Sequence, residues 1–239
     1  MLKRLTLLPI GLLLGLLACQ DTPPVGQEPP NVAARDTLIT YLALGDSYTI
    51  GESVAVGERW PMHLWRYLVD SSVAVDSPRI IARTGWTTDE LQAAMDQTTW
   101  LADTFDLVSL LIGVNNQYRS YDFARYEADF TALLQRALAL AQGNPDRVFV
   151  VSIPDYGVTP FGQTRDSQKI AQELDHYNAY AFRVADSMGI AFYHITDISR
   201  EALDDTTLVA PDNLHPSGTM YRRWVEEVIG PGVLGQVGE

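Results

Sequence analysis

Five short apolar runs, separated by longer amphipathic stretches, constrain the fold of this chain more than any other feature. They cover residues 38–44, 79–82, 107–112, 147–153 and 190–195. Nearly continuous apolar sequence is typical of strands that are covered on both faces, as they are in parallel sheets. We therefore expect a five-stranded parallel sheet.

The stretches between these runs have the period of a helix. After Ser167, and again after Tyr121, apolar residues recur at spacings of three and four, which predicts helices with one buried face. The two stripes are Ile170, Leu174, Tyr177, Ala181, Val184 and Met188, and Tyr126, Phe130, Leu133 and Ala137. Strands that alternate with helices are joined by right-handed crossovers. The predicted fold is a three-layer α/β/α sandwich, whose reactive groups should collect at the carboxyl ends of the strands.

The first residues have the pattern of an export signal. Lys3 and Arg4 precede an apolar stretch, residues 5–18, which is shorter than the roughly 20 residues that span a bilayer. Small Ala18 stands directly before Cys19, the only cysteine of the chain. This pattern resembles the lipobox of bacterial lipoproteins and implies cleavage before Cys19, with lipid attached to that residue. A plain secretory signal that is cleaved elsewhere is the alternative.

Residues 19–36 differ in composition from the rest of the chain. They contain Pro23, Pro24, Pro29 and Pro30 and show no hydrophobic periodicity, so we expect an extended tether. One domain should then cover residues 37–239. Gln20 after the cysteine resembles outer-membrane sorting, and the expected location is the bacterial cell envelope, with the protein exported and lipid-anchored. Which face of the membrane it occupies stays open.

Charge and histidine content exclude several functions. The chain has 17 Lys and Arg against 30 Asp and Glu, a net charge of -13, which argues against nucleic acid as a partner. No pair of cysteines and no closely spaced histidines are present, so we expect no disulfide within the chain, no metal and no cofactor. We also expect a monomer.

Polar residues of the kinds used in acyl transfer stand where strands are expected to end. Ser47 lies just after the first strand, Asn115 follows the third, and Asp212 and His215 precede the last helix. Acyl transfer requires a hydroxyl nucleophile, an imidazole base, a carboxylate that orients the base and an amide donor. The other three histidines, His63, His176 and His194, lie in expected helices or strands, and we interpret them as structural.

These residues fall in four blocks that resemble the SGNH (GDSL) hydrolases, a family of serine esterases and lipases. The blocks are Gly45-Asp46-Ser47, Gly85, Gly113-Val114-Asn115 and Asp212-Asn213-Leu214-His215-Pro216. The resemblance implies a flavodoxin-like fold and a catalytic triad of Ser47, Asp212 and His215. It also implies an oxyanion hole made by the N–H groups of Ser47 and Gly85 and the amide of Asn115.

Two smaller local expectations concern capping. Asp46 has a short side chain suited to cap the turn that presents Ser47. Thr87 and Glu90 have the spacing of a helix capping box.

The substrate is less constrained than the reaction. The chain departs from the common family pattern at Tyr48 and Asn116, and we expect these two residues, with Trp86 and Tyr156, to bind substrate. The overall pattern resembles lysophospholipases and thioesterases, which act on acyl esters. A carbohydrate O-acetylesterase of the cell envelope and a non-catalytic, lipid-anchored binding protein are the alternatives.

Overall fold

The computed structural model describes residues 38–102 and 104–237. The signal peptide expected at residues 1–18, the tether expected at residues 19–36 and the lipidation expected at Cys19 lie outside the described residues. Within the described ranges, no helix combines the length and the apolar character needed to cross a membrane.

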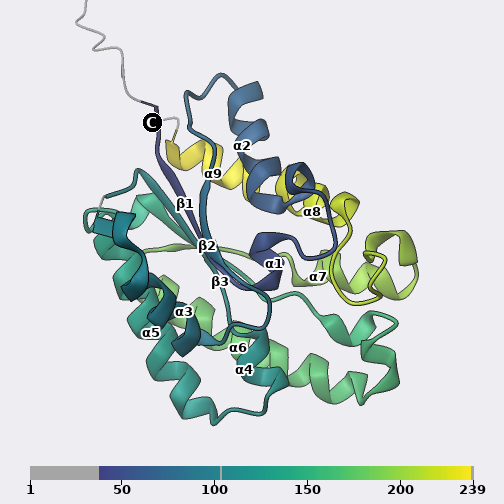
Figure 1. Ribbon diagram of the computed structural model, residues 1–239. Coiled ribbons are helices and arrows are strands. Elements are labelled where there is room, and N and C mark those ends of the chain that lie inside the picture. The colour runs from purple at the N-terminus through teal and green to yellow at the C-terminus, as the bar shows by residue number, and fades with distance from the viewer. Residues whose placement is uncertain (1–37, 103, 238–239) are drawn as a thin grey trace, which may run out of the picture. The chain divides into compact units, whose positions relative to one another are not determined.

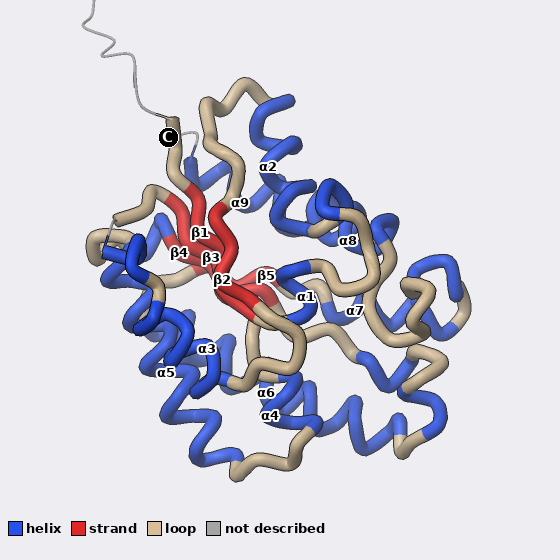
Figure 2. Tube along the Cα trace, in the orientation of Figure 1, coloured by secondary structure: helices blue, strands red, loops and turns tan. Residues whose placement is uncertain are grey.

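The five apolar runs form one parallel sheet, as predicted (Figures 1 and 2). The strand order is β2-β1-β3-β4-β5. The strands are β1 (Tyr41–Gly45), β2 (Arg79–Ala82), β3 (Leu107–Leu111), β4 (Val148–Val151) and β5 (Ala191–Tyr193). Every residue of β1, β3 and β4 is buried, which agrees with their continuous apolar sequence.

Several strands are shorter than predicted because other groups take up the backbone at their ends. Ile39 forms an isolated bridge with Val75 outside the sheet. At the end of β4, the Asn178 side chain accepts from the Ile153 N–H at 2.7 Å and donates to the Ile153 carbonyl at 2.9 Å. Beyond Ser152, whose N–H still donates to the Tyr193 carbonyl at 3.0 Å, this amide takes the backbone groups that would continue the strand.

Helices cover both faces of the sheet and complete the three predicted layers (Figure 1). One layer holds α3 (Thr88–Gln97), α5 (Phe123–Leu140) and α6 (Ser167–Ser187); the other holds α2 (Trp60–Asp70), α8 (Gly218–Trp224) and α9 (Gly230–Val237). The remaining α-helices are α1 (Ser47–Ile50), α4 (Val114–Tyr118) and α7 (Thr196–Arg200), and a π-helical segment, Val225–Ile229, joins α8 to α9. The apolar stripes predicted for α5 and α6 are buried, except that Val184 and Met188 near the end of α6 are only partly covered.

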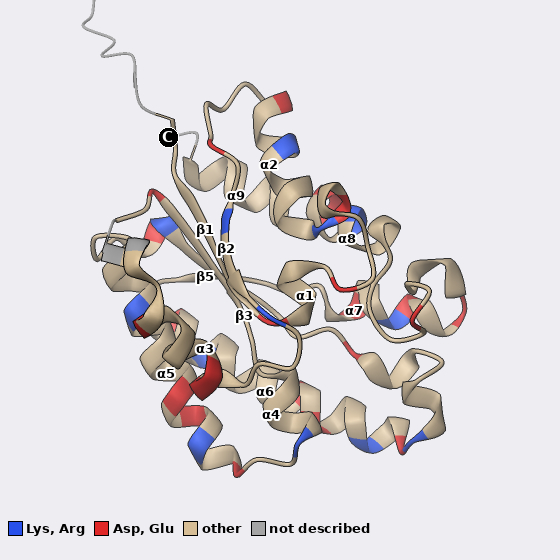
Figure 3. Cartoon of the chain, viewed as in Figure 1, with Lys and Arg blue, Asp and Glu red and all other residues tan. Residues whose placement is uncertain are grey.

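The strand order places a crevice between two neighbouring strands. β1 is followed by a connection to β2, whereas its other neighbour β3 is followed by a connection to β4. At such a switch point the two chain segments leave in opposite directions, which opens space at the carboxyl ends of the strands. Among the five strands only Arg79 is charged, and charged residues gather on helices and loops (Figure 3).

Candidate active site

A pocket of about 320 Å³ opens at the carboxyl ends of β1 and β3. Four of the five residues predicted for catalysis line it: Ser47, Gly85, Asn115 and His215. Its other lining residues are Tyr48, Thr84, Val114, Tyr118, Tyr156, Phe161 and Leu214. The fold thus brings together residues that are far apart along the chain, and most of the pocket wall is aromatic or aliphatic.

Ser47 is held at the start of α1, directly after β1. Asp46 is the N-cap of this short helix, and its Oδ1 accepts from the Tyr48 N–H at 3.0 Å, so the predicted cap is confirmed. Gly45 allows the tight turn, because a Cβ there would lie 2.5 Å from the carbonyl oxygen of Leu111. Burial raises the pKa of Asp46 to about 7. The turn leaves Ser47 mostly buried, with its side chain in the pocket wall.

His215 and Asp212 form a close pair. The Nδ1 of His215 lies 2.6 Å from Oδ2 of Asp212, and Oδ1 of Asp212 accepts from the N–H groups of Leu214 and His215, both at 2.9 Å. A bond between Nδ1–H and the carboxylate leaves Nε2 unprotonated in the neutral ring, which is the state a general base needs. The carboxylate therefore orients the imidazole.

Ser53 adds a further hydrogen bond that the sequence did not suggest. Its hydroxyl donates to Oδ2 of Asp212 at 2.7 Å, across 159 positions of the chain. Burial alone would raise the pKa of Asp212, but the hydrogen bonds from Ser53, His215 and Leu214 outweigh it and lower the pKa to about 2. Asp212 is therefore ionised throughout the neutral range. Ser53 has a φ of 65°, a local irregularity that no motif signals.

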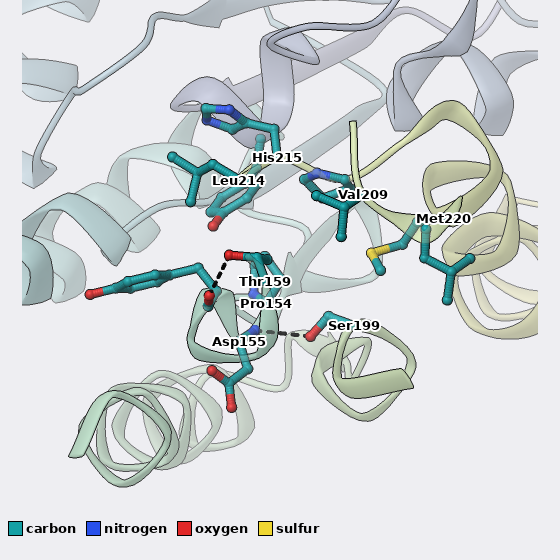
Figure 4. Close-up of a pocket in the computed structure, with 12 residues that line it drawn as sticks. Pro154, Asp155, Thr159, Ser199, Val209, Leu214, His215 and Met220 are labelled. Carbon is teal, nitrogen blue, oxygen red and sulfur yellow. Dashed lines mark hydrogen bonds between the residues drawn. The ribbon is translucent and has the colours of Figure 1, made fainter. Parts of the chain in front are cut away.

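A second cavity, of about 10 Å³, lies behind His215 (Figure 4). Leu214, Val209 and Met220 lie on one side of it, and Thr159 and Ser199 on the other. This volume is close to the smallest that can hold one water molecule. His215 borders both cavities, so its ring lies between a tightly packed region and the larger pocket.

Two of the three predicted oxyanion donors, Gly85 after β2 and Asn115 on α4, lie on segments that are bonded to each other. Gly85 has a φ of +84°, which a residue with a side chain rarely adopts. The Nδ2 of Asn115 donates to the Trp86 carbonyl at 2.9 Å, and Nη2 of Arg119 donates to the Gly85 carbonyl at 2.5 Å. The amide of Asn115 retains a second hydrogen for a ligand. Arg119 was not singled out from the sequence, because nothing local marks a residue that bonds across 34 positions.

The structure corrects one predicted substrate contact. Asn116 is fully buried, and its Oδ1 accepts from the Thr88 N–H at 3.1 Å while its Nδ2 donates to the Thr88 hydroxyl at 2.8 Å. Consecutive residues of a helix point about 100° apart, so the side chain next to Asn115 is turned toward α3. Asn116 is therefore a structural link between α4 and α3, and it does not line the pocket.

Of the other three residues predicted to bind substrate, two line the pocket and one does not. Tyr48 and Tyr156 line the pocket. Trp86 instead packs against the core, and only its backbone meets the site, through Asn115. The predicted capping box at the start of α3 is present, with the Thr87 N–H donating to Glu90 at 2.9 Å.

The remaining histidines lie away from this pocket. His63 is on α2 beside Arg66, at 3.2 Å from Nδ1 to Nη2. The ring of His176 lies 4.1 Å from that of Phe123, and His194 lies 4.7 Å from Phe192. Of the four, His215 is the one in the pocket.

Comparison with known proteins places this site in a family. The model of the GDSL-like lipase/acylhydrolase family matches residues 43–223. No curated protein matches the chain. Among solved structures, TesA is 17% identical with a TM-score of 0.65, and the match covers 82% of this chain and 99% of TesA.

Two further structures have the same fold. Axe2, an acetylxylan esterase from Geobacillus stearothermophilus, is 19% identical with a TM-score of 0.59 over 84% of this chain and 94% of its own. LAE5, an alpha/beta hydrolase enzyme from the metagenome of Lake Arreo in Spain, has the same identity and TM-score over 84% of this chain and 95% of its own. Because the family model covers most of the domain, the chain belongs to the GDSL-like lipase/acylhydrolase family and is a carboxylic ester hydrolase.

Proposed function

We propose that this protein is a serine esterase that hydrolyses acyl esters through an acyl-enzyme on Ser47. The observation that carries the proposal is that His215, paired with Asp212 at 2.6 Å, lines the same pocket as Ser47. A nucleophile, an oriented base and donors for an oxyanion around one apolar pocket form the arrangement that acyl transfer needs.

In this mechanism, Oγ of Ser47 attacks the ester carbonyl carbon while Nε2 of His215 takes the hydroxyl proton. The N–H groups of Ser47 and Gly85 and the amide of Asn115 stabilise the negative charge on the carbonyl oxygen. When the tetrahedral intermediate collapses, His215 gives its proton to the departing alcohol. Water then attacks the acyl-enzyme by the same route and releases the acid.

The pocket wall favours an acyl group as its occupant. Val114, Tyr156, Phe161 and Leu214 give it a largely apolar lining, and a volume of about 320 Å³ lies at the lower end of the roughly 300–1,000 Å³ found for small-molecule sites. These features support short to medium acyl chains, in the manner of a lysophospholipase or thioesterase. A carbohydrate O-acetylesterase is the second candidate. It is supported by the small pocket, by Tyr118 at the rim, a residue that is 46% exposed, and by the acetylxylan esterase Axe2 among the structures of similar fold.

The test is hydrolysis of p-nitrophenyl esters from acetate to palmitate by the full chain purified in detergent. We expect a maximum at short to medium chains and loss of turnover in Ser47→Ala. Ser71→Ala is the matched control, because that exposed hydroxyl bonds only the carbonyl of Tyr67 at the end of α2. Turnover that survives in Ser47→Ala would overturn the triad, and no turnover on any of these esters would refute the preference for simple acyl esters in favour of a substrate recognised mainly through its leaving group.

We also propose that the mature protein begins at a lipidated Cys19 and is held on the envelope membrane by that lipid. The support is the sequence pattern of residues 1–19. Expression with radiolabelled palmitate should label the wild-type protein and not Cys19→Ser, and only the wild type should partition into detergent. Equal labelling of the two would refute lipidation at this residue.

A further inference from the structure

An arginine side chain is stacked on the aromatic rim of the catalytic pocket. The guanidinium of Arg165 lies 4.7 Å from the ring centre of Phe161 and 5.0 Å from that of Tyr118. Its Nη2 donates to the Tyr118 hydroxyl at 3.0 Å. Both rings line the pocket, so a positive charge is held at the pocket mouth.

The rim itself is a packed cluster. Tyr118, Tyr156 and Phe161 have ring centres 6.2 to 6.5 Å apart. Burial raises the pKa of Tyr156, while its hydrogen bond to Gln117 and, after it, the charge of Arg165 oppose that rise. Aromatic stacking restrains the guanidinium, so little rotational freedom would be lost when it binds a ligand.

Arg165 also differs from Arg119, the other arginine near this pocket, because it has no acidic partner among the described residues. Among the described residues, no carboxylate lies within ion-pairing distance of it, although residue 165 is exposed and the chain carries a net charge of -13. The adjacent Asp166 caps α6 by accepting from the Lys169 N–H at 3.0 Å. By contrast, Arg119, which does not line the pocket, is paired with Glu90 at 3.3 Å and bonds the Gly85 carbonyl. The guanidinium of Arg119 thus bonds groups of the protein, whereas that of Arg165 makes one hydrogen bond, to Tyr118, and keeps N–H groups for a ligand.

We propose that Arg165 is an anion-binding group that selects esters carrying a phosphate or carboxylate near the ester bond. A planar guanidinium with free N–H groups binds such oxyanions with paired, charge-assisted hydrogen bonds. The acyl group would occupy the apolar pocket, and the anionic group, on the leaving alcohol, would lie at the rim. This inference rests on the proposed esterase function and names the substrate class that the site prefers.

The test compares three butyrate esters with the same acyl group: glycerol monobutyrate, 1-butyryl-glycerol 3-phosphate and 3-butyryloxybutanoate. The last two separate a phosphate from a carboxylate. The full chain and Arg165→Gln are assayed together with Arg183→Gln. Arg183 is the matched control, because it stacks on Tyr180 at 5.8 Å on α6 and neither residue lines the pocket.

We expect the wild type to prefer the anionic esters. Arg165→Gln should lower the ratio of kcat/KM for the phosphate ester over the neutral ester by roughly 10- to 100-fold, the size of a lost hydrogen bond to a charged group, mainly through KM. Arg183→Gln should keep the wild-type ratio. The preference should also weaken in 0.5 M NaCl, because salt screens an exposed charge. A wild-type ratio in Arg165→Gln would overturn the proposal.

Binding without turnover separates this inference from the esterase function. In the Ser47→Ala background, calorimetry with 1-butyryl-glycerol 3-phosphate should give binding that is weakened by Arg165→Gln. One outcome would support the esterase function and refute the anion site: Ser47 is needed to hydrolyse the neutral ester, but Arg165→Gln has no effect on the anionic esters. Binding that is unchanged by Arg165→Gln would refute the anion site even if no ester were turned over.

Discussion

Two adjacent asparagines on α4 offer a sharp test of the oxyanion hole. Asn115 lines the pocket and donates one amide hydrogen to the Trp86 carbonyl, whereas Asn116 is buried and makes two hydrogen bonds with Thr88. Removing one oxyanion donor typically costs about 100- to 1,000-fold in kcat, or roughly 2.7–4 kcal/mol. We therefore expect Asn115→Ala to reduce kcat to that extent. It should cost only about 0.5–1.5 kcal/mol in stability, for the bond to Trp86.

Asn116→Ala should have the opposite profile. It leaves the N–H of Thr88 buried without its acceptor, which costs about 1–3 kcal/mol and lowers Tm by roughly 2–12 °C for a domain of this size. Its kcat should fall by less than about tenfold, since it does not reach the pocket. Steady-state kinetics on p-nitrophenyl butyrate and thermal unfolding of both variants provide the measurements. The reasoning is refuted if Asn115→Ala stays within threefold of the wild type, or if Asn116→Ala loses as much kcat as Asn115→Ala.

Two further predictions concern carboxylates near Ser47 and His215. Ser53→Ala removes the bond that helps hold Asp212, and a bond worth about 0.5–1.5 kcal/mol should lower kcat by roughly 2- to 10-fold at unchanged KM. Ser53→Gly, which also lacks the hydroxyl but suits the φ of 65° at this position, should lose kcat to the same extent, and a change in KM alone would contradict a positioning role. Asp46 has its pKa raised from 3.8 to about 7, so between those pH values the folded state keeps a proton that the unfolded state releases, and the contribution of Asp46 to stability falls as pH rises. In melts from pH 4.5 to 7.5, Asp46→Asn should therefore gain stability relative to the wild type as pH rises, and parallel curves would disprove the shift.

Much of the fold follows from local sequence pattern. Apolar runs and helical periodicity predicted the sheet and the layers, because strand and helix periods are set by the backbone and are visible over a few residues. The strand ends were less accurate. β4 stops where Asn178 takes the backbone groups of Ile153, and a bond between residues 25 positions apart leaves no trace in a local pattern.

The sequence by itself determined the four motif blocks and the order in which they occur, and hence the candidate residues Ser47, Gly85, Asn115, Asp212 and His215. It did so because each residue type has its own chemistry and each block is local. Four of these residues share one pocket, and Asp212 meets it through His215.

Only the tertiary structure decided which other side chains belong to the site. It turned Asn116 away toward Thr88 and brought Ser53 to Asp212. It also stacked Arg165 on Tyr118, 47 positions away. These contacts join segments that meet only when the sheet is assembled, so the partner that a side chain meets across the fold leaves no mark in the local spacing of residues.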